Sequence, residues 1–327
     1  MRFFIKLFLS IQLLLSFSFV KGQSSLADSL FHPDSLRHIV EILASDSLNG
    51  RFTGTVENFK AALFISDEFR KAGLSHVAGN TGFFQEIKQA WYNVIGAIKG
   101  KSKPGQLIIF SAHYDHVGTN STNPYPNDKF VADNTDEIFN GANDDASGVA
   151  AVISLAKYFK ALNNNERTLL FIAFTGEELG LLGSQFLANE YEPDSIVAVI
   201  NIEMIGRSEF KNQKPYITGY EYSDLKKILN RSYQVYGDKS EKEFFKIDPY
   251  IKSFLFTRSD NYPFALKGVP AHSIMLTPPE DKYYHHPDDE SWTLDYRKMK
   301  KVIEGVAYGT IGLIKGTDTP GRIKGIY

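Results

Sequence analysis

The stretch QLIIFSAHYDH, residues 106–116, joins a short apolar run directly to a group of His and Asp side chains. The run at residues 106–111 is rich in β-branched and aromatic residues, which predicts a buried strand that stops at His113. The same pattern recurs in TLLFIAFTGEE at residues 168–178 and IVAVINIE at residues 196–203. Strands are therefore expected at residues 106–111, 168–174 and 196–202, with a further apolar strand at residues 93–99.

Apolar residues at helical spacing lie before and between these strands. They predict helices at residues 56–72, 147–162 and 179–188. Strands that alternate with helices imply an α/β fold whose mostly parallel sheet is covered on both faces. Sheets of this kind bind ligands at the carboxyl ends of their strands, so the polar residues that follow the strands are the first candidates for a functional site.

Composition excludes several classes of function. The chain has 327 residues, with 36 Lys and Arg against 38 Asp and Glu, which gives a formal net charge of -2. A chain with this balance has no global attraction for nucleic acid or for acidic membranes. The sequence has no cysteine, so disulfides, thiolate metal sites and Cys nucleophiles are excluded. Any metal chemistry must use His and carboxylate side chains.

The first 22 residues have the pattern of a secretory signal peptide. Arg2 and Lys6 precede an apolar run of 14 residues at 7–20, and Gly22 is small. A membrane anchor is the weaker alternative, because spanning a bilayer takes roughly 20 apolar residues. We therefore expect export to the periplasm or the external medium, with no stable membrane association after cleavage. Residues 23–327 are expected to form a single domain.

The first polar cluster follows the strand at residues 106–111. In an extended segment His113 and Asp115 point to the same side, because strand side chains repeat every two residues. A carboxylate in this position can orient the imidazole and raise its basicity as a metal ligand.

The second cluster is GANDDASG at residues 141–148. Asp144 and Asp145 could cap the following helix or hold a cation, and the spacing alone leaves both open.

Three more clusters follow. Glu177 and Glu178 come after a buried strand, where one could bind a metal ion while the other takes a proton from water. The alternative is the first turn of the next helix, where the helix dipole favours acids. Glu203 ends an apolar strand, where a solvated acid is not expected. His285 and His286 stand beside Pro and Asp residues that are also typical of a surface turn.

Taken together, these clusters supply imidazoles and carboxylates in the ratio that two neighbouring divalent ions need. Imidazole and carboxylate ligands without thiolate suit zinc, although cobalt or manganese could substitute.

Ordered motifs across residues 48–289 resemble one known family. They are GRFTG (50–54), NVIGAIKG (93–100), SAHYDHVG (111–118), NGANDDASGVA (140–150), FTGEELGLLGS (174–184), NIEMIGR (201–207), RSDNYPF (258–264) and YHHPDD (284–289). The chain resembles the co-catalytic zinc metallopeptidases that include secreted bacterial leucyl aminopeptidases, glutamate carboxypeptidase and glutaminyl cyclase. The resemblance implies a three-layer α-β-α sandwich with a mixed, mostly parallel central sheet. Larger relatives insert a protease-associated domain where this chain has only residues 85–92, so no such insert is expected.

The resemblance also implies two Zn²⁺ ions per chain and a role for each matching residue. The implied ligands are His113 and Glu203 for one ion, Glu178 and His285 for the other, and Asp144 as the bridge between them. Glu177 would be the general base, and Asp115 would orient His113. His285 is preferred to His286 because it lies two residues before Pro287, as in the family.

Two positions depart from the family. It usually has Asp where Glu203 stands, and the extra methylene changes the reach of that ligand. It often has His where Asn261 stands, in a region that shapes the substrate pocket. Residues 116–140 are longer than a minimal turn and are expected to form either a rim loop beside the site or a passive insertion.

The expected function is that of an exported zinc-dependent aminopeptidase that hydrolyses N-terminal residues from peptides. Two alternatives remain: a single-zinc cyclotransferase like glutaminyl cyclase, and a non-catalytic binding protein on the same fold. Because acids or His occupy all five ligand positions and Glu177 is present, two metals and hydrolysis are favoured.

Overall fold

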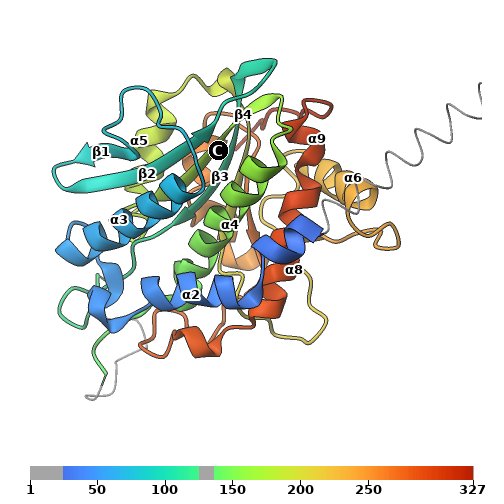
Figure 1. Ribbon diagram of the computed structural model, residues 1–327. Coiled ribbons are helices and arrows are strands. Elements are labelled where there is room, and N and C mark those ends of the chain that lie inside the picture. The colour runs from blue at the N-terminus through green and yellow to red at the C-terminus, as the bar shows by residue number, and fades with distance from the viewer. Residues whose placement is uncertain (1–24, 125–135, 327) are drawn as a thin grey trace, which may run out of the picture.

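A computed structural model describes residues 25–124 and 136–326, so the expected signal peptide and part of the expected rim loop lie outside the described residues. Its centre is an eight-stranded sheet with the order β1-β2-β4-β3-β5-β8-β6-β7 (Figure 1). The strands are β1 Phe84–Lys88, β2 Trp91–Ile98, β3 Lys103–His113, β4 Arg167–Phe174, β5 Ile196–Glu203, β6 Tyr216–Ile217, β7 Lys246–Ile247 and β8 Ala271–Met275. Four of the seven neighbouring pairs are parallel, which confirms the mixed, mostly parallel sheet.

Helices cover both faces of the sheet. They are α2 Pro33–Leu43, α3 Val56–Lys71, α4 Ser147–Leu162, α5 Leu182–Glu190, α6 Leu225–Tyr236, α7 Tyr262–Ala265, α8 Tyr296–Gly309 and α9 Ile311–Ile314. In Figure 1, α2, α3 and α4 lie in front of the sheet and α5 lies behind it. Strand β3 shows why: Ile108 and Phe110 pack into the core on one side, while Ile109 packs with Leu187 of α5 on the other. A strand buried on both faces has to be apolar throughout, so the three-layer α-β-α sandwich is confirmed.

Most predicted elements match the structure closely. The helix predicted at residues 147–162 is α4, with identical bounds, and the ends of β2, β3, β4, β5 and α3 fall within three residues of the predicted ones. The predicted start of the helix at residue 179 is wrong. Gly180 and Leu181 have left-handed φ angles of 100° and 63°, so α5 begins at Leu182. Glu177 and Glu178 therefore lie in the turn after β4, and their alternative assignment to a first helical turn is also wrong.

None of the helices within residues 25–124 and 136–326 has both the length and the apolar character needed to cross a membrane.

The motif GRFTG contributes a buried cation that joins distant segments. Arg51 has no exposed surface, and its guanidinium donates hydrogen bonds to the backbone carbonyls of Leu43, Tyr114, Asn140 and Gly141. These carbonyls belong to the end of α2, the segment after β3 and the loop before α4. One side chain therefore joins three segments by donating hydrogen bonds to their backbone carbonyls.

We expect Arg51→Lys to lower the free energy of unfolding by about 3 kcal/mol, because a lysine has three donors on one atom and cannot span this set of carbonyls. Urea unfolding followed by circular dichroism measures the change. The control is Arg70→Lys on α3, whose side chain is 70% exposed and which should unfold like the wild type. An Arg51→Lys protein as stable as this control would contradict the structural role of Arg51.

Candidate functional site

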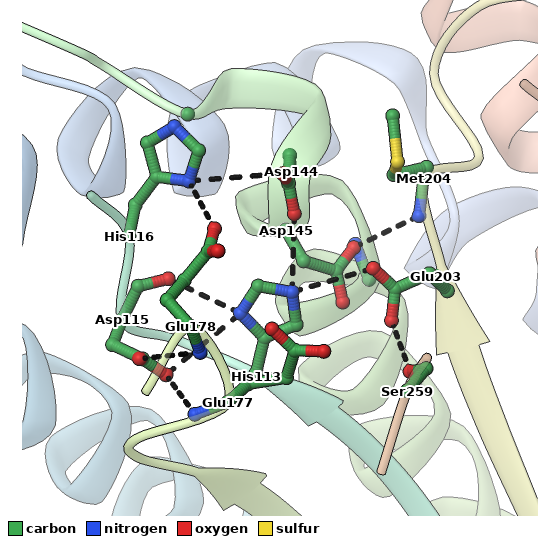
Figure 2. A network of polar contacts seen from close by, with 12 residues as sticks. His113, Asp115, His116, Asp144, Asp145, Glu177, Glu178, Glu203, Met204 and Ser259 are labelled. Atoms are coloured by element: carbon green, nitrogen blue, oxygen red, sulfur yellow. Dashed lines mark hydrogen bonds and ion pairs between the residues drawn. The ribbon is translucent and has the colours of Figure 1, made fainter. Parts of the chain in front are cut away.

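The candidate site lies at the carboxyl ends of the parallel strands β3, β4 and β5. His113 is the last residue of β3 and Glu203 the last of β5, while Glu177 and Glu178 follow β4 and Asp144 precedes α4. Figure 2 shows their side chains converging on one region from separate segments of the chain. This is the edge at which open α/β sheets bind ligands.

One group of ligand atoms is centred on His113. Its Nε2 lies 3.1 Å from Oδ1 of Asp144 and 3.3 Å from Oε1 of Glu203. All three residues are buried, and their ligand atoms lie within 4.8 Å of one another. An imidazole and two carboxylates at such distances form a donor set suited to a divalent ion such as zinc.

The other oxygen of Asp144 faces a second group. Nε2 of His285 lies 3.4 Å from Oδ2 of Asp144 and 3.2 Å from Oε2 of Glu178. The two oxygens of Asp144 thus face different imidazoles, which is the arrangement a bridging carboxylate requires. His286 is turned toward its own loop instead, where its Nδ1 accepts a hydrogen bond from the backbone N–H of Asp288.

A third imidazole, which the sequence analysis did not select, lies at the second group. Nδ1 of the fully buried His116 is 2.9 Å from Oε1 of Glu178 and 3.8 Å from Oδ2 of Asp144. In a continuing strand, His116 would point away from His113, because side chains alternate. Strand β3 ends at His113, so the alternation stops there and both imidazoles reach the same site. The sequence feature that could have identified His116 is that it is the second His of the motif SAHYDHVG.

Asp115 holds the turn that carries the two glutamates. Its carboxylate accepts hydrogen bonds from the Thr53 hydroxyl and from the backbone N–H groups of Glu177 and Glu178. Nδ1 of His113 lies 3.2 Å from the Asp115 carbonyl oxygen and 3.8 Å from its carboxylate. A carbonyl oxygen can only accept, so in the neutral ring Nδ1 carries the proton and Nε2 presents its lone pair to the acids.

The two acids before α4 have different roles. Of the two roles considered from the sequence, holding a cation fits Asp144 and capping the helix fits Asp145. Asp144 faces the site, whereas Oδ1 of Asp145 accepts the backbone N–H groups of Gly148 in α4 and Met204 after β5, both at 3.0 Å. Asp145 therefore caps the first turn of α4 and fixes it to the end of β5. The peptide bond between the two acids is cis.

The segment RSDNYPF lies behind Glu203 and beside the cleft. The Ser259 hydroxyl donates a 2.5 Å hydrogen bond to Oε2 of Glu203. Asn261 is buried and bonded to the Ser273 hydroxyl and the Phe256 carbonyl. Its neighbours Arg258, Tyr262 and Pro263 line the cleft. Asn261, where the chain departs from the family pattern, therefore lies behind the residues that line the cleft.

The adjacent glutamates differ in basicity. Burial alone would raise the pKa of Glu178, but His285 and His116 beside it bring this pKa down to about 2. Burial acts against the charged form of His285, and the negative charges of Glu178 and Asp144 raise its pKa to about 10. Burial raises the pKa of Glu177 well above its usual range, an effect that His113 opposes. Glu178 is thus suited to remain an anionic ligand, and Glu177 to accept a proton.

Two cavities adjoin these residues. A cleft of about 990 Å³ has Glu177, Glu178 and His285 among its lining residues and also apolar side chains such as Leu181 and Leu266. A cavity of about 40 Å³ lies among residues that include the acids Asp144, Glu177, Glu178 and Glu203. A water molecule needs roughly 10–15 Å³, so this space between the carboxylates is large enough for small occupants. The donor types and this space fit divalent metal ions.

Asp289 fixes the Asp144 loop to the loop that carries His285. Its carboxylate accepts the backbone N–H groups of Asn143 and Asp144 at 3.0 to 3.1 Å. Nη1 of Arg207 donates to the same carboxylate at 2.6 Å. The relative position of Asp144 and His285 therefore depends on a buried acid that the sequence analysis did not select, since only the folded chain brings these loops together.

The fold and its buried imidazole–carboxylate groups are those of a metallopeptidase domain. Residues 93–310 match the model of Peptidase family M28, and the chain belongs to this family.

Curated relatives agree with this membership. The chain is 26% identical over 247 residues to aminopeptidase YwaD of Bacillus subtilis, a match that covers 72% of this chain and 48% of that protein. It is 34% identical over 120 residues to a probable zinc metalloprotease of Phaeosphaeria nodorum, covering 36% of this chain and 24% of the relative. The chain thus spans half or less of the length of these curated relatives.

Solved structures show the same fold. Legionella LapA has a TM-score of 0.69 at 19% identity and covers 90% of this chain and 76% of its own. The zinc aminopeptidase BSAP of Bacillus subtilis has a TM-score of 0.67 at 16% identity, covering 87% and 95%. Glutaminyl cyclase of Porphyromonas gingivalis has a TM-score of 0.62 at 17% identity, covering 87% and 99%.

We expect Asp289→Asn to lower the free energy of unfolding of the metal-free protein by about 1–3 kcal/mol. The amide group would place a donor against backbone N–H groups and a guanidinium that are themselves donors. Urea unfolding in the presence of a chelator measures the loss. Asp288→Asn is the matched control, because that neighbouring side chain is 58% exposed. Identical unfolding curves for the two variants would contradict the anchoring role.

Proposed function

We propose that this chain is an exported zinc-dependent aminopeptidase that hydrolyses N-terminal residues from peptides. The observation that carries the proposal is that the single carboxylate of Asp144 faces two imidazole-containing groups. Glu177 lies beside these groups, and the large cleft adjoins them. The names of the relatives support it, since they include an aminopeptidase and a probable zinc metalloprotease. Export is supported by the apolar run at residues 7–20, and the domain at residues 23–327 would be the catalytic one.

The ligand set that we propose for two Zn²⁺ ions is His113 and Glu203 for one, Glu178 and His285 for the other, and Asp144 between them. When bound, the ions would polarise the scissile carbonyl and lower the pKa of water. The contact of Nδ1 of His113 with the Asp115 carbonyl selects, for the neutral ring, the tautomer whose Nε2 is free to bind a metal ion. The imidazoles beside Glu178 favour its anionic state.

Glu177 is the proposed general base. It accepts a proton from the attacking water and passes it to the amine that leaves. Its backbone N–H is held by Oδ1 of Asp115 at 3.2 Å, so Asp115 positions the base as well as the ligand His113. This separates proton transfer at Glu177 from metal binding at Glu178, although the two residues are adjacent.

Cyclisation of N-terminal glutamine is the second candidate, because glutaminyl cyclase of Porphyromonas gingivalis shares the fold. Two groups of potential ligands that share Asp144 favour two metals and hydrolysis over a single-zinc reaction. The test measures zinc per chain by elemental analysis, together with hydrolysis of a panel of aminoacyl-arylamides and cyclisation of a glutaminyl peptide. Two zinc ions with chelator-sensitive aminoacyl release are expected. One zinc with cyclisation would establish the second candidate, and no zinc with no turnover would indicate a binding protein.

We expect Glu177→Gln to lower turnover by about a hundredfold or more while both zinc ions stay bound, because the change removes a base and not a ligand. Steady-state kinetics and elemental analysis on the same sample test this. Glu190→Gln, at the exposed end of α5, is the control and should behave like the wild type. Loss of zinc from Glu177→Gln would show that the roles of the adjacent glutamates are reversed.

Asp144→Ala should behave differently and lose both zinc ions together, because both groups share this carboxylate. Elemental analysis after gel filtration measures the number of zinc ions that remain bound per chain. A variant that still held two zinc ions would eliminate the bridging role.

A further inference from the structure

The second group of ligand atoms contains one more imidazole than the five-residue set needs. His116 reaches Glu178 and Asp144 through Nδ1, at 2.9 and 3.8 Å. His285 reaches the same two carboxylates from its own loop, at 3.2 and 3.4 Å. The two rings are 5.6 Å apart between centroids, at an interplanar angle of 71°. Two acids are thus flanked by two imidazoles that come from segments far apart in the sequence.

The packing around His116 fixes which edge of its ring faces the acids. The residue has no exposed surface, and among the described residues its Nε2 has no hydrogen-bond partner. Behind the ring lies Gly141, where a Cβ atom would stand 2.6 Å from Cγ of His116. A side chain at residue 141 would therefore push the ring out of place. The glycine leaves room for an imidazole whose polar contacts are all made toward the acids.

We propose that His116 is a further ligand of the second metal ion, which would then be held by Asp144, Glu178, His285 and His116. This inference rests on the proposed two-zinc function. Zinc bonds to nitrogen and oxygen are about 2.0–2.2 Å long, which places the ligand atoms of a tetrahedral site roughly 3.3–3.6 Å apart. The four nitrogen-to-oxygen distances at this group, from 2.9 to 3.8 Å, lie on both sides of that value.

The consequence is that the two metal sites are unequal. The first group has one imidazole, from His113, whereas the second has two. A zinc ion with four protein ligands is held in a closed site, while one with fewer keeps positions open for water or substrate. We therefore expect the second ion to be the more tightly bound, and the first to be the one that exchanges.

A hydrogen bond from Nδ1–H of His116 to Glu178 could also produce the 2.9 Å contact, so the test must separate a ligand from a hydrogen-bond donor. His116→Asn does this, since the side-chain amide can still donate to Glu178 but is a poor zinc ligand. His116→Ala removes both. His286→Asn is the control, because that neighbouring imidazole is 28% exposed and bonded within its own loop.

The experiment measures zinc affinity by competition with a chelator, and the number of imidazoles per zinc by X-ray absorption. We expect three imidazoles over two zinc ions in the wild type and two over two in a reloaded His116→Asn protein. Both His116 variants should bind one of the two ions more than about 100-fold more weakly, because loss of a hydrogen-bond partner alone typically changes affinity about 10–100-fold. The control should match the wild type.

The outcomes separate this inference from the proposed function. A His116→Asn protein with wild-type affinity for both ions, or two imidazoles over two zinc ions in the wild type, would overturn the ligand role and leave the two-zinc proposal standing. A wild type that binds fewer than two zinc ions would overturn both. The absorption measurement on the wild type needs no variant, so a folding defect in His116→Ala would not prevent a decision.

Discussion

The candidate site depends on the carboxylate of Asp144. One of its oxygens faces His113 and the other faces His116 and His285. A buried carboxylate is costly unless it is paired, and here imidazoles lie close to both oxygens. Asp144 follows no strand, however, so the sheet does not hold it directly. Its position depends on contacts that other loops make with the segment around it.

Three buried acids that do not carry the chemistry supply such contacts. Asp289 holds the backbone at residues 143–144, Asp145 joins the start of α4 to the end of β5, and Asp115 holds the turn of Glu177 and Glu178. Each does this by accepting backbone N–H groups that would otherwise lack partners. The buried acids are therefore of two kinds. Some face the cavity, and the others fix the loops that carry those cavity-facing acids.

This division explains what could be predicted from sequence. The strands and the polar clusters at their ends follow from apolar runs and local spacing. The choice of Asp144 rather than Asp145, and of Glu178 rather than Glu177, as metal ligands came from the family resemblance. The contacts of Asp289 and Arg51 could not be predicted, because each joins segments that only the folded chain brings together. His116 was not selected. Side-chain alternation continued past His113 would turn its ring away from the site, but β3 ends at His113 and the alternation does not apply beyond it. The start of α5 was misplaced because Leu181 takes a left-handed conformation that a leucine rarely adopts.

The departure at Glu203 can also be assessed physically. A glutamate is one methylene longer than an aspartate, and an unconstrained carboxylate could move away from His113. The Ser259 hydroxyl binds Oε2, which leaves Oε1 at 3.3 Å from Nε2 of His113. That separation is close to the 3.1 Å between the same nitrogen and Asp144. The longer side chain is therefore held in range, and the first group keeps the same donor types that an aspartate would give. The unusual feature of the site is then the second group, where a chain turn after β3 brings His116 to the same carboxylates as His285.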